Sequence, residues 1–227
     1  MYDLYIGNKN YSSWSLRSWL LMRHAGMEFE EIRLRLDFTE GASFERQLLA
    51  VAPIAKVPVL VDQGLVVWDT LAIAEYLAEA YPDLGLWPRA RAARAKARSL
   101  CAEMHAGFAA LRSSFPMNIE AALPEVGAQV LREQPAVVRD LARLGAMWSD
   151  ALAGSGGPFL FGAFGIVDAF YAPVCTRLRT YGVTLPPRPM AYAQRVLELP
   201  AQQEWDEAAR AEADFLPLEE PYRKARD

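Results

Sequence analysis

The chain has 227 residues, of which 52% are hydrophobic and 23% charged, and its formal net charge is −4 at pH 7. This composition is typical of a folded globular protein, excludes a disordered one, and gives no overall positive charge that would attract nucleic acid. The two cysteines and two histidines are isolated from one another and no apolar run approaches membrane-spanning length, so we expect no disulfide framework, no metal site and no membrane partner.

The first 82 residues alternate between strand-like and helix-like patterns. The predicted elements are a strand over 2–7, a helix over 14–25, a strand over 28–34, a weak helix over 42–49, strands over 57–61 and 65–68, and a helix over 70–81 that Asp69 caps. A helix between two strands makes them parallel, whereas the tight turn at residues 62–64 makes the last two antiparallel. This βαβαββα order predicts a small mixed sheet with helices on its faces, which is the thioredoxin-like arrangement.

Beyond residue 82 the strand signals end, and Ala, Arg, Leu and Glu dominate. Residues 82–88 (PDLGLWP) interrupt the pattern, as a linker would. Helices are predicted over 89–114, 123–152, 166–181, 189–197 and 201–211, followed by a loosely packed extension after Leu216. We therefore predict an α+β protein with a thioredoxin-like domain over 1–82, a linker over 83–88 and an all-helical bundle domain over 89–227.

Three short motifs of the first domain lie at the starts of predicted elements. Residues 11–17 (YSSWSLR) open the first helix, Val57-Pro58 opens a strand, and Asp69-Thr70 opens the helix over 70–81. Each motif by itself has a purely structural interpretation. Serines and aspartates cap helices, and a proline, which cannot donate to the sheet ladder, marks an edge strand. The functional hypothesis depends on their order and placement together.

Taken together, the motifs resemble those of the serine-type members of the cytosolic glutathione S-transferase family. The resemblance covers nearly the whole chain, although the helical half is similar mainly in layout. SSWSLR is most similar to the SSCSWR-type motif of the zeta class, with Trp14 in place of the cysteine, whereas the spacing back from Arg17 is similar to that of theta-like members. The resemblance implies a glutathione-binding thioredoxin-like domain and an all-helical partner domain.

The resemblance also implies that a serine of the turn hydrogen-bonds the glutathione sulfur. A thiol with a pKa of about 8.5 is mostly protonated at neutral pH, and only its thiolate is a good nucleophile. A hydroxyl donor and the positive end of a helix both stabilise that thiolate. The zeta-like alignment selects Ser12 and the theta-like spacing selects Ser13. Both are therefore candidate catalytic residues, with Ser12 placed first and Tyr11 third.

The other two motifs are implied to hold the rest of glutathione. Pro58 follows a cis bond in the family, so the Val57 backbone is free to pair with the cysteinyl backbone of glutathione like an added strand. Lys56 would meet the glycine carboxylate. Thr70 and the free N–H groups of its helix would bind the γ-glutamyl carboxylate, while Asp69 balances the neighbouring ammonium.

The acceptor substrate is expected beside the first long helix of the second domain, which faces the glutathione sulfur in the family. An apolar stripe on that helix has two interpretations, core and pocket lining. Cys101 and Leu111 are interpreted as core, and Arg17 and Arg112 as arginines in salt bridges or in solvent. The candidate pocket residues are Tyr11, Trp14, Met104, His105, Phe108 and Phe115.

Asp168 is interpreted as a structural residue. Residues 165–168 (GIVD) resemble the N-capping box of the family, in which an acid caps the free N–H groups of a buried helix. Gly165 takes the place of the hydroxyl residue, so half of the reciprocal hydrogen bonding is missing. We expect Asp168 to stabilise the fold and to take no part in catalysis.

The predicted function is glutathione transfer, in which the bound thiolate attacks a small hydrophobic electrophile, with glutathione as co-substrate and no metal. One alternative is glutathione-dependent cis–trans isomerisation of a maleylacetoacetate-like diacid, which the zeta-like motif favours. Trp14 and the lack of obvious diacid-binding arginines speak against it. A further alternative, of another class, is a non-catalytic binding or assembly module on the same fold. The resemblance also implies a cytoplasmic homodimer.

Overall fold

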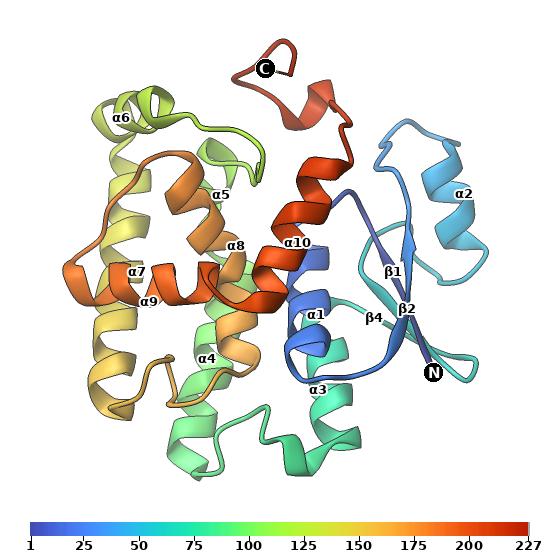
Figure 1. The fold of residues 1–227 in the computed structure, drawn as a ribbon, viewed down its shortest axis with the longest axis horizontal. Helices are drawn as coiled ribbons and strands as arrows, with labels where there is room; N and C mark the ends of the chain where they lie inside the picture. Colours follow the sequence, from blue (N-terminus) through green and yellow to red (C-terminus); the bar gives the residue numbers. More distant parts are fainter. Residues whose placement is uncertain (227) are drawn as a thin grey trace.

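The computed structural model describes residues 1–226, and a four-stranded mixed sheet organises its N-terminal part (Figure 1). The elements of this part are, in chain order, β1 (Tyr2–Ile6), α1 (Ser13–His24), β2 (Phe29–Arg33), α2 (Ser43–Leu49), β3 (Val59–Asp62), β4 (Leu65–Trp68) and α3 (Thr70–Ala80). The strands lie in the order β2-β1-β3-β4, with β1 parallel to β2 and antiparallel to β3, and β3 antiparallel to β4. The predicted thioredoxin-like arrangement is confirmed.

Alternation along the strands gives the sheet two apolar faces. Leu4 of β1 and Leu60 of β3 belong to the large core that includes side chains of α1 and α3. Val59, the neighbour of Leu60, belongs instead to a smaller cluster with Phe44 and Leu48 of α2. The sheet therefore lies between α2 on one face and α1 with α3 on the other, as Figure 1 shows.

The C-terminal part of the described chain is built from helices. They are α4 (Arg91–Ala106), α5 (Ala109–Ser114), α6 (Pro124–Glu133), α7 (Pro135–Ser155), α8 (Ile166–Thr180), α9 (Pro187–Leu197) and α10 (Pro200–Ala211), with the short 3-10 helices η1 (Pro82–Leu84) and η2 (Pro217–Glu219). Every residue of α8 except Arg179 is buried, as expected of a helix at the centre of a domain. Because α8 also packs against α1, it joins the helical domain to the sheet domain.

Two of the predicted helices are interrupted. The helix predicted over 89–114 divides into α4 and α5 at Gly107 and at Phe108, whose φ of 55° is left-handed. The helix predicted over 123–152 divides into α6 and α7 at Gln134, because the following Pro135 disfavours the helical conformation at the residue before it. Each break separates a short helix, α5 or α6, from a longer one.

The chain after α10 packs back onto the rest of the molecule, so the prediction of a loosely packed extension is wrong. Leu216 and Glu220 are 6% and 4% exposed. The Tyr222 hydroxyl donates to the carbonyl of Ser114 at 2.8 Å. Hydrogen bonds of polar side chains hold this tail, residues 212–226, in place. The sequence prediction relied on apolar periodicity, which does not detect such hydrogen bonds.

The linker and the start of α8 approach each other closely. The backbone N–H of Ile166 donates to the carbonyl of Leu86 at 3.1 Å. A Cβ on Gly165 would lie 2.7 Å from that same carbonyl oxygen, so a side chain there would displace the linker. This explains physically why glycine stands where the capping box has a hydroxyl residue. The domain division at residues 83–88 stays a prediction.

Asp168 caps the same helix end from inside the core. It is 1% exposed, its Oδ2 accepts from the N–H of Gly165 at 2.9 Å, and its Oδ1 accepts from the N–H of Leu160 at 3.1 Å. One carboxylate thus satisfies two backbone donors that have no helical partner. It lies outside the cleft described below.

We expect Gly165→Ser, which would restore the usual capping residue, to lower the free energy of unfolding by about 1–3 kcal/mol, the usual cost of overpacking. The added Cβ must push the Leu86 carbonyl away from its hydrogen bond. Urea unfolding at neutral pH measures the change. Gly154→Ser in α7 is the matched control, because a Cβ there meets nothing within 4 Å. A Gly165→Ser protein as stable as the wild type would contradict the explanation.

Candidate active site

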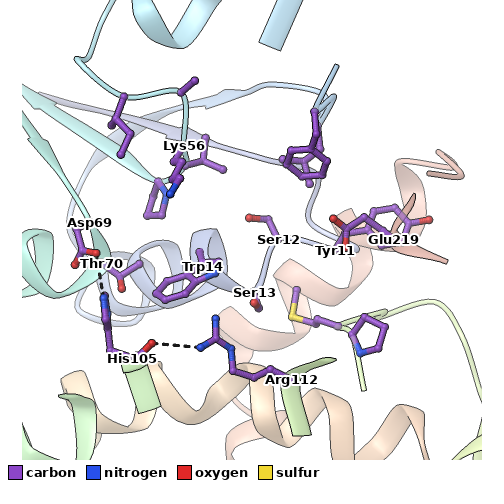
Figure 2. Close-up of a pocket in the computed structure, with 18 of the residues that line it drawn as sticks. Tyr11, Ser12, Ser13, Trp14, Lys56, Asp69, Thr70, His105, Arg112 and Glu219 are labelled. Carbon is purple, nitrogen blue, oxygen red and sulfur yellow. Dashed lines mark hydrogen bonds and ion pairs between the residues drawn. The ribbon is translucent and has the colours of Figure 1, made fainter. Parts of the chain in front are cut away.

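A cleft of about 980 Å³ opens between the sheet domain and the helical domain (Figure 2). One wall comes from the turn before α1, the segment before β3 and the start of α3, and the other from α4, α5 and α8. The structure thus gathers segments that are far apart in the sequence. Of the site residues predicted from the sequence, the cleft is lined by Tyr11, Ser12, Ser13, Trp14, Lys56, Val57, Pro58, Asp69, Thr70 and His105.

Ser12 is the N-cap of α1 and one end of a short hydrogen-bonded chain. Its Oγ accepts from the backbone N–H of Ser15 at 3.3 Å and donates to the Ser15 Oγ at 2.8 Å. The Ser15 Oγ in turn accepts from the N–H of Gly7 at 3.0 Å. Either hydroxyl of the pair can donate to the other. When Ser15 donates, the hydrogen of Ser12 is available to an anion in the cleft, toward whose middle its hydroxyl points in Figure 2.

Ser13 and Trp14 form the first turn of α1. Within residues 1–226 the Ser13 hydroxyl has no hydrogen-bond partner, and Figure 2 shows it on the Arg112 side of the cleft. The Trp14 ring meets the His105 ring edge to face, with centroids 5.1 Å apart. The guanidinium carbons of Arg17 and Arg112 lie 4.2 Å and 5.0 Å from the Trp14 ring centroid. Trp14 is therefore held by residues from both domains.

The same wall also carries the two predicted peptide-binding motifs. The Val57–Pro58 bond is cis, and the exposed Lys56 precedes it. Asp69 caps α3, because its Oδ1 accepts from the N–H of Leu71 at 2.8 Å, while its Oδ2 lies 3.4 Å from the His105 Nε2. The Thr70 hydroxyl is buried at the start of α3 and has no partner within the described chain. A buried hydroxyl beside a helix N-terminus is suited to a carboxylate ligand.

Tyr11 lines the cleft, but its hydroxyl is engaged by the tail. It donates to the Glu220 Oε1 at 2.8 Å and accepts from the N–H of Leu216 at 3.4 Å. Burial, and then the hydrogen bond to Glu220, raise the pKa of Tyr11 to about 12. The phenol thus holds the tail in place. Glu219, the residue before Glu220, lies at one end of the cleft (Figure 2).

Three predicted pocket residues belong to the core instead. Met104, Phe108 and Phe115 are 0%, 7% and 1% exposed, and none of them lines the cleft. The Phe115 ring stacks on Tyr181 with centroids 4.5 Å apart. Arg112 of α5 and Met117, in the segment after α5, line the helical-domain wall where the helical spacing predicted aromatic side chains.

Arginines line the helical-domain wall, contrary to the prediction. Arg112 of α5 and Arg177 of α8 face the cleft, and Arg17 lies behind Trp14. Within residues 1–226 none of the three forms an ion pair with a carboxylate. Arg17 is 2% exposed, so its interpretation as a salt-bridged or solvated residue is wrong, whereas Arg112 is half-buried and faces the open cleft. Arg177 was missed altogether. Its signal was an arginine inside a mostly apolar helical run, residues 166–178 (IVDAFYAPVCTRL).

Two family models match successive parts of the chain. The N-terminal domain of glutathione S-transferase matches residues 11–80, and the C-terminal domain of glutathione S-transferase matches residues 91–211. The chain belongs to the glutathione S-transferase family. A solved glutathione transferase homolog from Burkholderia GL BGR1, with bound glutathione, shares the fold of this family member with a TM-score of 0.68. The two chains are 23% identical, over 92% of this chain and 98% of that one.

Curated relatives of this glutathione S-transferase family member carry different names. A probable maleylacetoacetate isomerase of Caenorhabditis elegans is 34% identical over 101 residues, which are 44% of this chain and 45% of the relative. A stringent starvation protein A homolog of Coxiella burnetii is 29% identical over 167 residues, 74% of each protein. The alignment with the isomerase spans less than half of either chain, so it does not by itself transfer an activity.

The part of the chain that the structure describes has no cluster of candidate metal ligands and no helix suited to span a membrane. Residues 1–226 hold no group of three or more His, Cys, Asp or Glu side chains arranged to bind a metal ion. None of the helices in that range is long and apolar enough to cross a membrane. Cys101 and Cys175 are buried, and burial raises the pKa of both thiols, so neither is poised as a nucleophile.

Proposed function

We propose that this protein is a glutathione transferase that joins the glutathione thiolate to a small hydrophobic electrophile. The observation that carries the proposal is the convergence, in one cleft, of the Ser12–Ser15 hydroxyl pair at the start of α1, the cis Val57–Pro58 bond and the Thr70 hydroxyl, which has no hydrogen-bond partner in residues 1–226. Membership of the glutathione S-transferase family supports it. Glutathione acts as co-substrate.

Each part of glutathione has a place in this proposal. The γ-glutamyl carboxylate binds the Thr70 hydroxyl and the N-terminal N–H groups of α3, and Asp69 balances the ammonium. The Val57 backbone pairs with the cysteinyl residue, and Lys56 meets the glycine carboxylate. The sulfur then lies at the N-terminus of α1, where the helix dipole and the Ser12 hydroxyl both favour the thiolate.

The chemical step needs only orientation and electrostatics from the protein. The thiolate forms a C–S bond to the electrophilic carbon, and the leaving group departs with the bonding electron pair. The proton of the thiol is released to solvent before the attack. Trp14 and the helical-domain wall hold the acceptor against the sulfur.

A second candidate is glutathione-dependent cis–trans isomerisation of a maleylacetoacetate-type diacid. The SSWSLR motif, the partial likeness to a probable maleylacetoacetate isomerase and the cleft arginines Arg112 and Arg177 favour it. In this reaction the thiolate adds to one alkene carbon, the adduct rotates about the resulting single bond, and the C–S bond breaks again. Glutathione is regenerated, so isomerisation and conjugation are distinguished by glutathione consumption.

A candidate of another class is a non-catalytic binding or assembly module. It is supported by the likeness to a stringent starvation protein A homolog and by the general rule that a fold does not determine a function. Such a module would bind glutathione without turning over an electrophile. The homodimer and the cytoplasmic location also remain predictions, and light scattering on the purified protein tests the first.

The test is glutathione binding by calorimetry, run beside conjugation of 1-chloro-2,4-dinitrobenzene. We expect binding with turnover, and Thr70→Val should weaken glutathione binding about tenfold or more, the usual effect of losing a hydrogen bond to a charged group. Thr184→Val is the matched control, since Thr184 lies outside the cleft.

Each other outcome selects a different candidate. Binding without conjugation, but with glutathione-dependent isomerisation of a cis-unsaturated diketo acid, would select the isomerase. Binding without either reaction would select the non-catalytic module. No binding, or equal binding by the wild type and Thr70→Val, would overturn the assignment of the glutathione site.

A further inference from the structure

Arg177 is buried with part of its guanidinium directed at the cleft. The residue is 5% exposed and lines the cleft. Its Nε donates to the carbonyl of Phe115 at 2.7 Å, and its Nη1 donates to the carbonyl of Pro173 at 3.1 Å. Its Nη2 has no partner in residues 1–226. Two hydrogen bonds thus fix the orientation of the fork, and one nitrogen remains for a ligand.

Arg112 lies on the same wall and is held more weakly. It is half-buried, and its Nη1 donates to the carbonyls of His105 and Gly107 at 3.3 Å and 3.5 Å, both long distances. Figure 2 shows the guanidinium between His105 and Ser13, at the edge of the open space. Most of its donors are therefore free for a ligand next to the place proposed for the glutathione sulfur.

Arg17 adds a third charge behind Trp14. Its Nε and Nη1 are buried without a hydrogen-bond partner in the described chain. Burial, and then the charges of Arg177 and Arg112, lower the pKa of Arg17 to about 9. Burial, and then the charge of Arg112, lower the pKa of Arg177 to about 10. Both guanidinium groups remain charged at neutral pH and repel each other.

The cleft holds too little negative charge to balance these cations. Buried charges without counterions are costly and are normally paired. Glu219 of the tail lines the cleft together with Arg177, but the two form no ion pair within 4.0 Å, and burial raises the pKa of Glu219 although Arg177 opposes the rise. Asp69 is engaged with Leu71 and His105 across the cleft. A glutathione thiolate would supply a single negative charge.

We propose that the helical-domain half of the cleft is an anion subsite, in which Arg112 and Arg177 bind a carboxylate of the second substrate. The proposal deepens the proposed function and rests on it. It commits to an electrophile that combines a small apolar body, which packs against Trp14 and Met117, with a carboxylate. The carboxylates of glutathione itself are placed on the opposite wall, at Lys56 and Thr70, and leave these arginines unpaired.

Binding is tested first, because it does not require turnover. The protein is loaded with S-methylglutathione, which has no reactive thiol, and titrated by calorimetry with 3-nitrobenzoate and with its neutral counterpart 3-nitrobenzamide. We expect the benzoate to bind at least about tenfold more tightly, the usual advantage of a hydrogen bond to a charged group. The titration is repeated without S-methylglutathione, so a protein that binds no glutathione still reports on the subsite.

Arg112→Gln should remove the preference for the benzoate, and Arg112→Lys should restore part of it. Arg188→Gln is the matched control, because Arg188 also donates to a backbone carbonyl but lies outside the cleft. A competition experiment on the wild-type protein tests the subsite without any substitution. Sodium sulfate should compete with 3-nitrobenzoate for the wild type and leave the binding of 3-nitrobenzamide unchanged.

Kinetics extend the test to the reaction. With 4-chloro-3-nitrobenzoate and 4-chloro-3-nitrobenzamide, the thiolate forms the C–S bond at the carbon that bears chlorine, and chloride leaves with the bonding pair. Each rate is divided by the uncatalysed rate of the same compound. Arg112→Gln should lower kcat/KM for the benzoate about tenfold to a hundredfold more than it lowers kcat/KM for the benzamide.

The outcomes separate this proposal from the proposed function. Equal affinities for benzoate and benzamide in the wild type, or a preference that persists in Arg112→Gln and is insensitive to sulfate, would overturn the subsite while conjugation of a neutral electrophile continues. A protein that turns over no electrophile, yet shows the benzoate preference and its loss in Arg112→Gln, would overturn the transferase and leave the subsite supported.

Discussion

Replacing Ser12 by alanine is expected to lower kcat/KM for glutathione conjugation about tenfold to a hundredfold, because a hydrogen bond to a charged group contributes about 1.5–3 kcal/mol. The Ser12 hydroxyl is the group at the start of α1 that has both a supporting partner, Ser15, and a direction toward the cleft. Titration of bound glutathione, followed by thiolate absorbance, gives a second readout. The pKa of the bound thiol should rise by about one to two units, as the same energy requires.

Ser13→Ala is the matched control in the same turn, and we expect a smaller loss of activity from it. Ser12 is also the N-cap of α1, so its replacement should cost about 1 kcal/mol of stability, and activity is measured well below the unfolding midpoint. If Ser13→Ala raises the thiol pKa and Ser12→Ala does not, the theta-like spacing identifies the catalytic serine. If neither change moves the thiol pKa, both serines are caps and the catalytic assignment fails.

Asp168→Ala is expected to lower the free energy of unfolding by about 2–5 kcal/mol, because it leaves two buried N–H groups, at about 1–3 kcal/mol each, without an acceptor. Those groups belong to Leu160 and Gly165. Urea unfolding at pH 7 measures the loss. Asp168→Asn keeps one acceptor oxygen and should lose less. Asp150→Ala, at a side chain that is 71% exposed, is the control and should change stability by less than about 1 kcal/mol.

The same residue predicts a pH dependence with a definite sign. Burial raises the pKa of Asp168 from 3.8 to about 7, although the N–H groups of Leu160 and Gly165 oppose the rise. Between these values the folded state binds a proton that the unfolded state has released, so the stability from this group is complete below about pH 4 and is lost as the pH rises to about 7. The stability lost in Asp168→Asn relative to the wild type should therefore shrink from pH 5 to pH 8. A loss that stays constant over that range would show that the carboxylate is ionised throughout and would contradict the raised pKa.

Local patterns predicted the element order and the three motifs of the sheet domain well. Period-two and period-3.6 alternation, caps and turn residues depend on neighbours in the chain, so the sequence contains them directly. The helix breaks at Phe108 and Gln134 show the limit of that reasoning. Pro135 offered a local signal for the second break, whereas the left-handed Phe108 is buried in the large core, a tertiary environment that no short window reports.

The two walls of the cleft also differ in how well the sequence predicted their residues. Ser12, Val57, Pro58, Asp69 and Thr70 were identified because each lies at the start of a predicted element, where backbone groups are free to bind a ligand. The residues of the opposite wall were predicted by helical spacing alone. Spacing tells which side chains share a face, and it does not tell whether that face meets the core or the cleft.

The sequence by itself determined the family, the thioredoxin-like order of strands and helices, and the wall of the site that is formed by local motifs, because these depend on contacts between residues close in the chain. Only the tertiary structure decided that Met104 and Phe115 belong to the core and that the tail binds Tyr11. It also decided that Arg112 and Arg177 both line the cleft and have no carboxylate partner in residues 1–226. Those outcomes depend on how α8 packs against α1, how α5 packs against α7, and how the tail packs against the turn before α1. Burial and charge balance are sums over all neighbours in space, and no single segment of the chain contains them.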